Sequence, residues 1–258
     1  MTLLDFPKRK NSNQKISMVT CYDASFARLV NESAVDCILI GDSCAMVMHG
    51  EHTTLPATIE MMALHTKAVR NGTDKFIVSD MPFLSTRKGL EYATDCAGKL
   101  LVAGANAVKI EGVDGQEDVI EHLVKSGIPV MSHLGLTPQF YNAFGGHKKQ
   151  GKTEDSVEKI KREAKAAQEL GCFSIVLECI PAELAREITN SVSIATIGIG
   201  AGLDCDGQVL VLQDLLGMSD FTPKFVHHFM DGKKLITDAL NEYAKEVSGG
   251  IFPHKENY

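Results

Sequence analysis

The chain has 258 residues, of which 44% are hydrophobic and 23% are charged, so it can bury a sizeable core and suits one α/β barrel or two smaller domains. Its formal net charge is −7 and no basic stripe interrupts it, which argues against a nucleic-acid-binding surface. Its seven cysteines form no Cys-x-x-Cys pair, so they signal neither a zinc site nor a redox motif and favour a reducing compartment.

The sequence gives no sign of export or membrane insertion. Residues 1–14 carry Lys8, Arg9 and Lys10 without an apolar segment behind them, which is unlike a secretory signal. No apolar run reaches the length of about 18 residues that a membrane span requires. We therefore expect a cytoplasmic protein with neither membrane nor nucleic acid as a partner.

Short apolar runs alternate with segments of helical periodicity along most of the chain. Strands are expected at 15–20, 36–40, 76–79, 107–111, 128–133, 173–177, 193–198 and 208–212. Helices are expected at 24–31, 56–70, 88–103, 114–125, 153–170, from Pro181 onward, and at 225–247. About eight such units in about 250 residues predict an α/β fold, a closed (β/α)8 TIM barrel. A doubly wound open sheet is less favoured, because no Gly-x-Gly-x-x-Gly follows the first strand.

The remaining segments flank or interrupt this alternation. Residues 43–55 have no clear period and hold His49 and His52, which suggests a long loop on the active face. Residues 135–152 enclose a polar, cationic stretch between glycines, which suits either a mobile lid or an ordinary surface loop. We expect residues 1–258 to form one barrel domain, with 1–14 packing loosely or capping one end and 248–258 forming a tail.

Four of the apolar runs end in a carboxylate, namely Asp42, Asp80, Glu111 and Glu178. In a parallel barrel the C-terminal strand ends share one face, so these acids and His133 would converge there. Three carboxylates in one cleft repel each other unless a proton or a cation intervenes, and Mg2+ prefers oxygen ligands of this kind. Each acid taken singly is more simply a cap for the next helix, whereas the set favours a shared site.

Other polar residues near these strand ends allow two interpretations each. Lys109 and Glu111 lie two apart on one strand and face the same way, while Ile110 faces oppositely. Lys109 would either pair with Glu111 or receive a substrate carboxylate or enolate oxygen. Glu178 follows an unbroken apolar run, where partial burial suits a general base. His133 would either donate a hydrogen bond to a developing oxyanion or be a satisfied core histidine.

Two further features carry weaker signals. The glycines of residues 198–202 lie where some barrels bind phosphate through backbone N–H groups, but they equally permit a tight turn or the close approach of a flat ligand. Cys179 follows Glu178 on the opposite strand face, so we expect it in the core rather than as a nucleophile.

Several motifs occur in order and at consistent separations from about Lys15 to Pro253. They are Thr20-Cys-Tyr-Asp23, Gly41-Asp-Ser43, Thr54-Leu-Pro56, Asp80-Met-Pro-Phe83, Gly104-Ala-Asn-Ala-Val-Lys-Ile-Glu-Gly112, His133-Leu-Gly-Leu-Thr-Pro-Gln139 and Ile197-Gly-Ile-Gly-Ala-Gly202. No single motif is specific, but together they closely resemble the ketopantoate hydroxymethyltransferase (3-methyl-2-oxobutanoate hydroxymethyltransferase) family. The chain departs from the family pattern at Cys21, Ser132 and Lys152.

The resemblance implies a barrel of the phosphoenolpyruvate mutase and isocitrate lyase type, assembled as a homodecamer. It implies transfer of a one-carbon unit from 5,10-methylenetetrahydrofolate to 3-methyl-2-oxobutanoate, a small 2-oxo acid, with Mg2+ as cofactor. The product, 2-dehydropantoate, leads to pantothenate and coenzyme A. A Mg2+-dependent 2-oxo acid lyase or aldolase on the same barrel, and a non-catalytic binding protein, are the alternatives.

By motif, the resemblance also implies roles for individual residues. The implied metal-site acids are Asp42, Asp80 and Glu111. The implied substrate-binding residues are Asp42, Ser43, Asp80 and Lys109. Glu178 is the implied proton acceptor, and Lys109 and His133 complete the expected catalytic set. A binding protein without turnover would need neither Glu178 nor Lys109.

Overall fold

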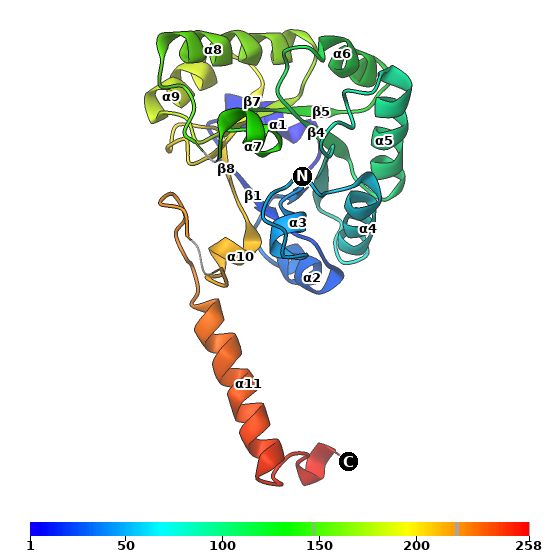
Figure 1. The fold of residues 1–258 in the computed structure, drawn as a ribbon, viewed down its shortest axis with the longest axis vertical. Helices are drawn as coiled ribbons and strands as arrows, with labels where there is room; N and C mark the ends of the chain where they lie inside the picture. Colours follow the sequence, from blue (N-terminus) through cyan, green and yellow to red (C-terminus); the bar gives the residue numbers. More distant parts are fainter. Residues whose placement is uncertain (147, 220–221, 258) are drawn as a thin grey trace. The chain divides into compact units, whose positions relative to one another are not determined.

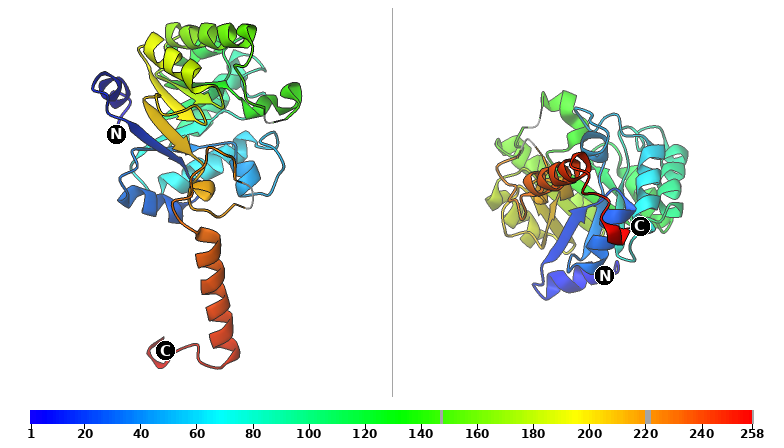
Figure 2. Two further views of the ribbon diagram at one scale, coloured as in Figure 1. Left: turned by 90° about the vertical axis from the view of Figure 1, so that its left-hand side faces the viewer. Right: turned by 90° about the horizontal axis from the view of Figure 1, so that it is seen from below.

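The computed structural model describes residues 1–146, 148–219 and 222–257, and in them eight parallel strands close into a barrel in sequence order. The strands are β1 (Ile16–Thr20), β2 (Cys37–Ile40), β3 (Phe76–Asp80), β4 (Ala107–Glu111), β5 (Val130–Gly135), β6 (Ser174–Glu178), β7 (Ala195–Ile199) and β8 (Gly207–Leu210). Strand β1 pairs with both β2 and β8, and the dark blue first strand and the gold eighth strand lie side by side in Figure 2. The predicted (β/α)8 barrel is confirmed.

One helix precedes the first strand, and helices between successive strands up to the seventh cover the outside of the barrel (Figure 1). They are α1 (Asp5–Asn11), α2 (Ala24–Glu32), α3 (Cys44–Val47), α4 (Ile59–Arg70), α5 (Leu90–Val102), α6 (Glu117–Lys125), η1 (Pro138–Phe140), α7 (Tyr141–Phe144), α8 (Glu154–Glu169) and α9 (Ala182–Ser191). Polar side chains cap the N-terminus of two of these helices. At α2, Asp23 accepts from the backbone N–H groups of Ser25 and Phe26, and at α8, Thr153 and Ser156 form a capping box.

The chain divides into two compact units, Met1–Leu210 and Val211–Tyr258. The first holds all eight strands of the barrel. The second holds α10 (Leu212–Leu215), α11 (Gly232–Ser248) and η2 (Lys255–Asn257). The expectation of a single domain over residues 1–258 stays a prediction. Among the described residues, none of the helices combines the length and the apolar character that crossing a membrane demands.

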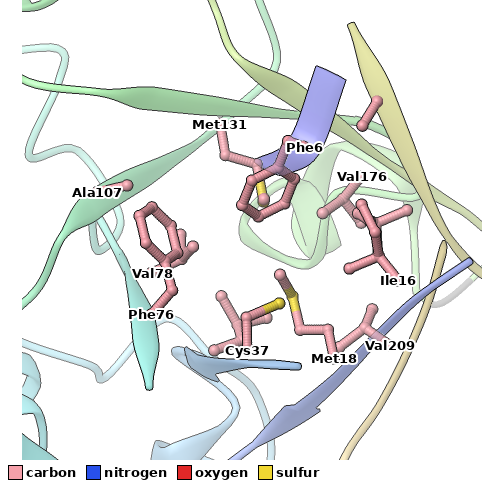
Figure 3. Close-up of a cluster of buried hydrophobic side chains, with 13 residues drawn as sticks. Phe6, Ile16, Met18, Cys37, Phe76, Val78, Ala107, Met131, Val176 and Val209 are labelled. Atoms are coloured by element: carbon pink, nitrogen blue, oxygen red, sulfur yellow. The ribbon is translucent and has the colours of Figure 1, made fainter. Parts of the chain in front are cut away.

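The N-terminal segment caps the barrel instead of packing loosely. Helix α1 places Phe6, which is fully buried, among strand side chains such as Ile16, Met131 and Val176 (Figure 3). The Phe6 ring also makes an edge contact with Phe76, with the ring centroids 5.5 Å apart. Of the two interpretations of residues 1–14, the end cap is therefore correct.

Some predicted boundaries were wrong. Residues 43–55 are not wholly a loop, because α3 occupies Cys44–Val47, and β5 runs two residues beyond His133 to Gly135. The last barrel strand stops at Leu210, and Leu212–Leu215 turn into α10. The terminal helix begins at Gly232 and not at residue 225, because the Asp231 side chain accepts from the Lys234 N–H and caps it there.

Candidate active site

The predicted site residues come together at the C-terminal ends of neighbouring strands. Asp42 follows β2, Asp80 and Glu111 are the last residues of β3 and β4, and Glu178 is the last residue of β6. His133 lies in β5, where the strand register pairs it with Glu111. The three acids Asp42, Asp80 and Glu111 are buried, and Glu178 is only partly buried. The convergence follows from parallel pairing, which brings all C-terminal strand ends to one rim.

Lys109 is buried at the centre of this rim and pairs with Asp80, not with Glu111 as one interpretation of the sequence had it. Its Nζ atom lies 3.2 Å from Asp80 Oδ1 and 3.0 Å from His133 Nδ1. Asp80 and Lys109 face each other in the register between β3 and β4, which explains the choice of partner. Burial disfavours the charged ammonium, but the charges of Asp80, Glu111 and Asp42 outweigh it and raise the pKa of Lys109.

Each acid is held through one oxygen by an N–H donor. The backbone N–H of Asp42 donates to Asp80 Oδ2 at 3.0 Å. Gln139 donates from Nε2 to Asp42 Oδ2 and from its backbone N–H to Glu111 Oε2, both at 2.9 Å. Among the described residues, Asp80 Oδ1 and Glu111 Oε1 find no aligned hydrogen-bond partner, although Lys109 Nζ lies near the former. These two buried oxygens are therefore under-satisfied.

Burial controls the protonation of the acids. Desolvation, together with the nearby charges of Glu111 and Asp80, raises the pKa of Asp42 well above its usual value. Desolvation also raises the pKa of Asp80, although Lys109 opposes the shift. It raises the pKa of Glu111 to about 7, again against the effect of Lys109. The three carboxylates thus cannot all ionise cheaply with a single lysine as counter-ion.

The chemistry of this donor set fits a hard divalent cation. The three side chains offer only oxygen ligands, two of their buried oxygens lack an aligned donor, and their combined negative charge exceeds the charge of Lys109. Within the part of the chain that the structure describes, no three histidine, cysteine, aspartate or glutamate side chains are grouped closely enough to hold a metal ion as they stand. Cation binding would therefore require the acids to turn toward one point, and their metal role stays a prediction.

His133 is held as a neutral imidazole between Lys109 and Glu178. Burial and the neighbouring Lys109 charge lower the pKa of His133. Because an ammonium can only donate, its contact with Nδ1 leaves the ring proton on Nε2, which lies 3.2 Å from Glu178 Oε2. That contact is not aligned as a hydrogen bond, so Nε2–H has no fully formed partner among the described residues. Of the two interpretations of His133, this geometry favours a donor over a fully satisfied core histidine.

Two glycines, Gly41 and Gly135, leave space for the site residues Ser43 and Glu178. Ser43 Oγ shares a 2.8 Å hydrogen bond with the hydroxyl of buried Tyr22, and a β-carbon on Gly41 would lie only 2.8 Å from that Oγ atom. Gly135 has φ +94°, and a β-carbon there would lie 2.3 Å from the backbone oxygen of Glu178. The absence of a side chain at Gly41 leaves room for Ser43, and its absence at Gly135 lets β5 approach β6 closely at Glu178.

The segment of residues 135–152 contains η1 and α7, and its C-terminal end packs against the barrel unit. The Gln150 N–H donates to the Cys179 carbonyl at 3.1 Å, and Gly151 is buried against Leu184 and Pro181. His147, which was part of the predicted lid, lies outside the described residues, and the lid role stays a prediction.

The Cys179 thiol has a pKa raised to about 12 by burial, which disfavours a role as nucleophile.

Of the glycines of residues 198–202, Gly198 lies in β7, and Gly200 and Gly202 lie in the turn after it. Gly200 and Gly202 have φ of +62° and +85°, and a β-carbon on Gly202 would lie 2.6 Å from Ala182 Cβ. This supports the tight-turn interpretation, while a phosphate site there stays a prediction.

Two of the positions at which the chain departs from the family pattern differ in burial. Ser132 is buried with its hydroxyl unpaired among the described residues, and Lys152 is exposed.

Sequence reasoning missed the site contacts of Tyr22 and Gln139. Both residues lie in the motifs, but neither is itself the polar residue at the end of an apolar run. Gln139 lies in an irregular segment whose path the periodicity does not predict. The one available signal was the position of Gln139 at the end of the motif that begins with His133.

Comparisons with known proteins decide the family. A family model described as ketopantoate hydroxymethyltransferase matches residues 1–255. The chain belongs to this family. The protein named 3-methyl-2-oxobutanoate hydroxymethyltransferase from Bdellovibrio bacteriovorus is 56% identical over 100% of this chain and 99% of its own length. Proteins of the same name from Francisella tularensis subsp. novicida and Coxiella burnetii are 52% and 53% identical, covering 99% and 100% of this chain and 97% and 98% of theirs.

Solved structures support the same fold at low sequence identity. Phosphonopyruvate hydrolase in complex with oxalate and Mg++ matches with a TM-score of 0.66 and 10% identity, over 100% of this chain and 92% of that one. A 2,3-dimethylmalate lyase, a PEP mutase/isocitrate lyase superfamily member, matches with a TM-score of 0.62 and 13% identity, over 98% of this chain and 91% of that one. The chain therefore shares the (β/α)8 barrel fold of these structures.

Proposed function

We propose that the chain transfers a hydroxymethyl group from 5,10-methylenetetrahydrofolate to 3-methyl-2-oxobutanoate, giving 2-dehydropantoate through an enolate. Membership of the ketopantoate hydroxymethyltransferase family supports the reaction class. The observation that carries the enolate chemistry is the buried ammonium of Lys109, set 3.0 Å from His133, whose other ring nitrogen lies beside Glu178. This arrangement puts a cation and a candidate base on one rim of the barrel.

The 2-oxo acid would bind against the ends of β2, β3 and β4. Ser43 and the N–H groups at the end of β2 would receive the substrate carboxylate, and Lys109 would face the ketone oxygen. Asp42, Asp80 and Glu111 would hold Mg2+, which when bound supplies a Lewis acid for the substrate oxygens and offsets the negative charge of the acids. Burial of the rim would strengthen each of these interactions by excluding water.

Glu178 would remove the proton from C3 of the 2-oxo acid. Its carboxylate is partly exposed, so a ligand can reach it, and His133 Nε2–H at 3.2 Å would orient it. The electron pair of the broken C–H bond would move onto the ketone oxygen, where the ammonium of Lys109 stabilises the enolate charge. The enolate carbon would then form a bond to the folate methylene carbon as the bond from that carbon to one folate nitrogen breaks. Water would supply the hydroxyl oxygen as the bond to the second folate nitrogen breaks. The two nitrogens would take up the proton removed from C3 and one proton of the water, giving tetrahydrofolate.

Hydrogen exchange at C3 tests the base directly. The wild-type protein with 3-methyl-2-oxobutanoate and MgCl2 in D2O, without folate, should incorporate deuterium at C3, as followed by proton NMR. Glu178→Gln should slow this exchange roughly 100- to 10,000-fold, because general base catalysis contributes that much. Glu183→Gln, an equal change at an exposed position of α9, is the matched control and should exchange normally. Exchange in Glu178→Gln at the wild-type rate would remove Glu178 from this role.

The folate donor separates the transferase from a lyase or aldolase on the same barrel. Consumption of the 2-oxo acid should require 5,10-methylenetetrahydrofolate and should fall when Mg2+ is chelated. Consumption that proceeds without folate would instead favour the lyase or aldolase.

We also propose that the chain acts in the cytoplasm as a homo-oligomer, with a decamer expected from the family. Support for an oligomer comes from α11, where Leu235, Ile236, Leu240, Tyr243 and Val247 are exposed. Apolar side chains that recur on one side of a helix normally pack against another element.

A further inference from the structure

Gln139 is the one residue of η1 that contacts three strand ends at once. Its side-chain Nε2 donates to Asp42 Oδ2 and to the Met81 carbonyl, both at 2.9 Å. Its backbone N–H donates to Glu111 Oε2, also at 2.9 Å. These partners follow β2, follow β3 and end β4, respectively. Gln139 thus links two of the proposed metal-site acids to the backbone beside the third, Asp80.

The chemistry of these contacts requires a nitrogen that donates two hydrogens, and the amide of Gln139 supplies such a nitrogen. Asp42 Oδ2, when ionised, and the Met81 carbonyl only accept hydrogen bonds, so one nitrogen must donate two hydrogens. A glutamine NH2 group does so, whereas a methionine of similar length donates none. Asparagine has the same amide on a stem that is one methylene shorter. The bond from the backbone N–H to Glu111 survives all these changes, so a substitution isolates the contribution of the amide.

The positions of these donors leave other oxygens of the acids open. Gln139 occupies Oδ2 of Asp42 and Oε2 of Glu111, and the Asp42 N–H occupies Oδ2 of Asp80. In the part of the chain that is described, Glu111 Oε1 and Asp80 Oδ1 have no aligned donor, although His133 Nδ1 lies 3.5 Å from the former and Lys109 Nζ lies 3.2 Å from the latter. Residues around a metal site commonly orient its ligands in this way. They donate a hydrogen bond to one oxygen of a carboxylate, and the other oxygen can then bind the metal.

We infer that Gln139 is a positioning residue that orients Asp42 and Glu111 for a divalent cation and so couples η1 to the metal site. The inference rests on the proposed function, because it presumes that these acids bind Mg2+. Gln139 acts through the acids and does not need to touch the metal or the substrate.

The test measures Mg2+ affinity, which does not depend on turnover. MgCl2 is titrated into the metal-free full-length protein by calorimetry, for wild type, Gln139→Met and Gln139→Asn. We expect both variants to bind Mg2+ about 10- to 100-fold more weakly, the usual cost of removing an outer-shell partner. Gln150→Met is the matched control, because the Gln150 side chain donates to the nearby Lys148 carbonyl and, among the described residues, contacts none of the acids. It should bind Mg2+ like wild type.

Circular dichroism melting distinguishes this role from a general structural one. A purely structural Gln139 would lower the melting temperature of both variants and leave their Mg2+ affinity unchanged, which would overturn the inference. If wild type binds Mg2+ and the Gln139 variants bind it equally well, the inference fails while the proposed function stands. If wild type itself binds no Mg2+, the metal part of the proposed function fails and the inference fails with it.

Discussion

Asp80 and Lys109 face each other across strands β3 and β4, and their side chains form a buried ion pair of 3.2 Å. The pairing follows from the register, because side chains at the same level of adjacent parallel strands point to the same face of the sheet. Lys109 is thereby the counter-ion of a cluster of three acids, and it also contacts His133 at 3.0 Å. The same residue thus supports both the stability of the metal-free site and the proposed enolate chemistry.

We expect Lys109→Met to destabilise the metal-free protein by about 3–5 kcal/mol at pH 8, the cost of leaving a buried charge unpaired. The loss should be smaller at pH 5, because burial raises the pKa of Asp42, Asp80 and Glu111, so fewer of these acids are ionised at pH 5 than at pH 8. Urea denaturation followed by circular dichroism measures the effect, since the chain has no tryptophan. Lys159→Met, at an exposed ion pair with Asp114, is the control. A loss of equal size at both pH values would contradict the explanation.

The raised pKa of Glu111 makes the stability of the metal-free protein depend on pH. The folded state holds this proton up to a pKa of about 7, against 4.5 for the ordinary side chain. Between those values the folded state binds more protons than the unfolded state, so the free energy of unfolding falls as pH rises. Glu111→Gln should remove up to about 3 kcal/mol of that fall, given the cost per pKa unit. The contributions of Asp42 and Asp80 would remain.

Urea denaturation of the metal-free protein at intervals from pH 4.5 to pH 8 checks this expectation. Glu117→Gln, at an exposed position in the first turn of α6, makes the same chemical change without burial. Its pH dependence should match wild type. Parallel curves for wild type and Glu111→Gln would show that Glu111 does not titrate as described.

The barrel and most of the strand-end acids could be predicted because their signals are local. An apolar run that stops at a carboxylate identifies both a buried strand and the residue at its end, as it does for four strands. Eight alternating strand and helix units leave few other folds. Contacts between strands were harder to predict. The sequence places Lys109 and Glu111 two residues apart, but only the register between β3 and β4 shows that Asp80 is the partner.

Irregular or short elements were missed for a related reason. Helix α1 is seven residues long, too short for a clear period, and its key contacts come from strands far along the chain. Gln139 lies in a three-residue η1 that no periodic pattern predicts. The start of α11 was placed too early, because apolar residues before Asp231 continue the helical spacing. The helix begins only after Asp231, whose side chain caps its N-terminus.

Phe6 should contribute strongly to the stability of the barrel. Its fully buried ring contacts Phe76 and Phe173, with ring centroids 5.5 and 4.9 Å away, and fills the end of the barrel (Figure 3). We expect Phe6→Ala to cost about 3–5 kcal/mol, the range for large buried aromatic side chains. Urea denaturation measures the change, and Leu4→Ala, at an exposed residue just before α1, should be nearly neutral. Equal effects of the two substitutions would mean that the segment does not act as a cap.

The exposed apolar side of α11 should carry contacts between copies of the chain. Ile236, Leu240, Tyr243 and Val247 are spaced by four, three and four residues, so they share one side of the helix, and all are exposed. A charge on this side would be desolvated in an interface, so we expect Leu240→Glu to shift the protein to smaller assemblies. Size-exclusion chromatography with light scattering measures the mass. Asn241→Glu adds the same charge about 100° around the helix and should leave the mass unchanged. A monomeric wild type, or an unchanged mass in Leu240→Glu, would exclude this side of α11 as the contact.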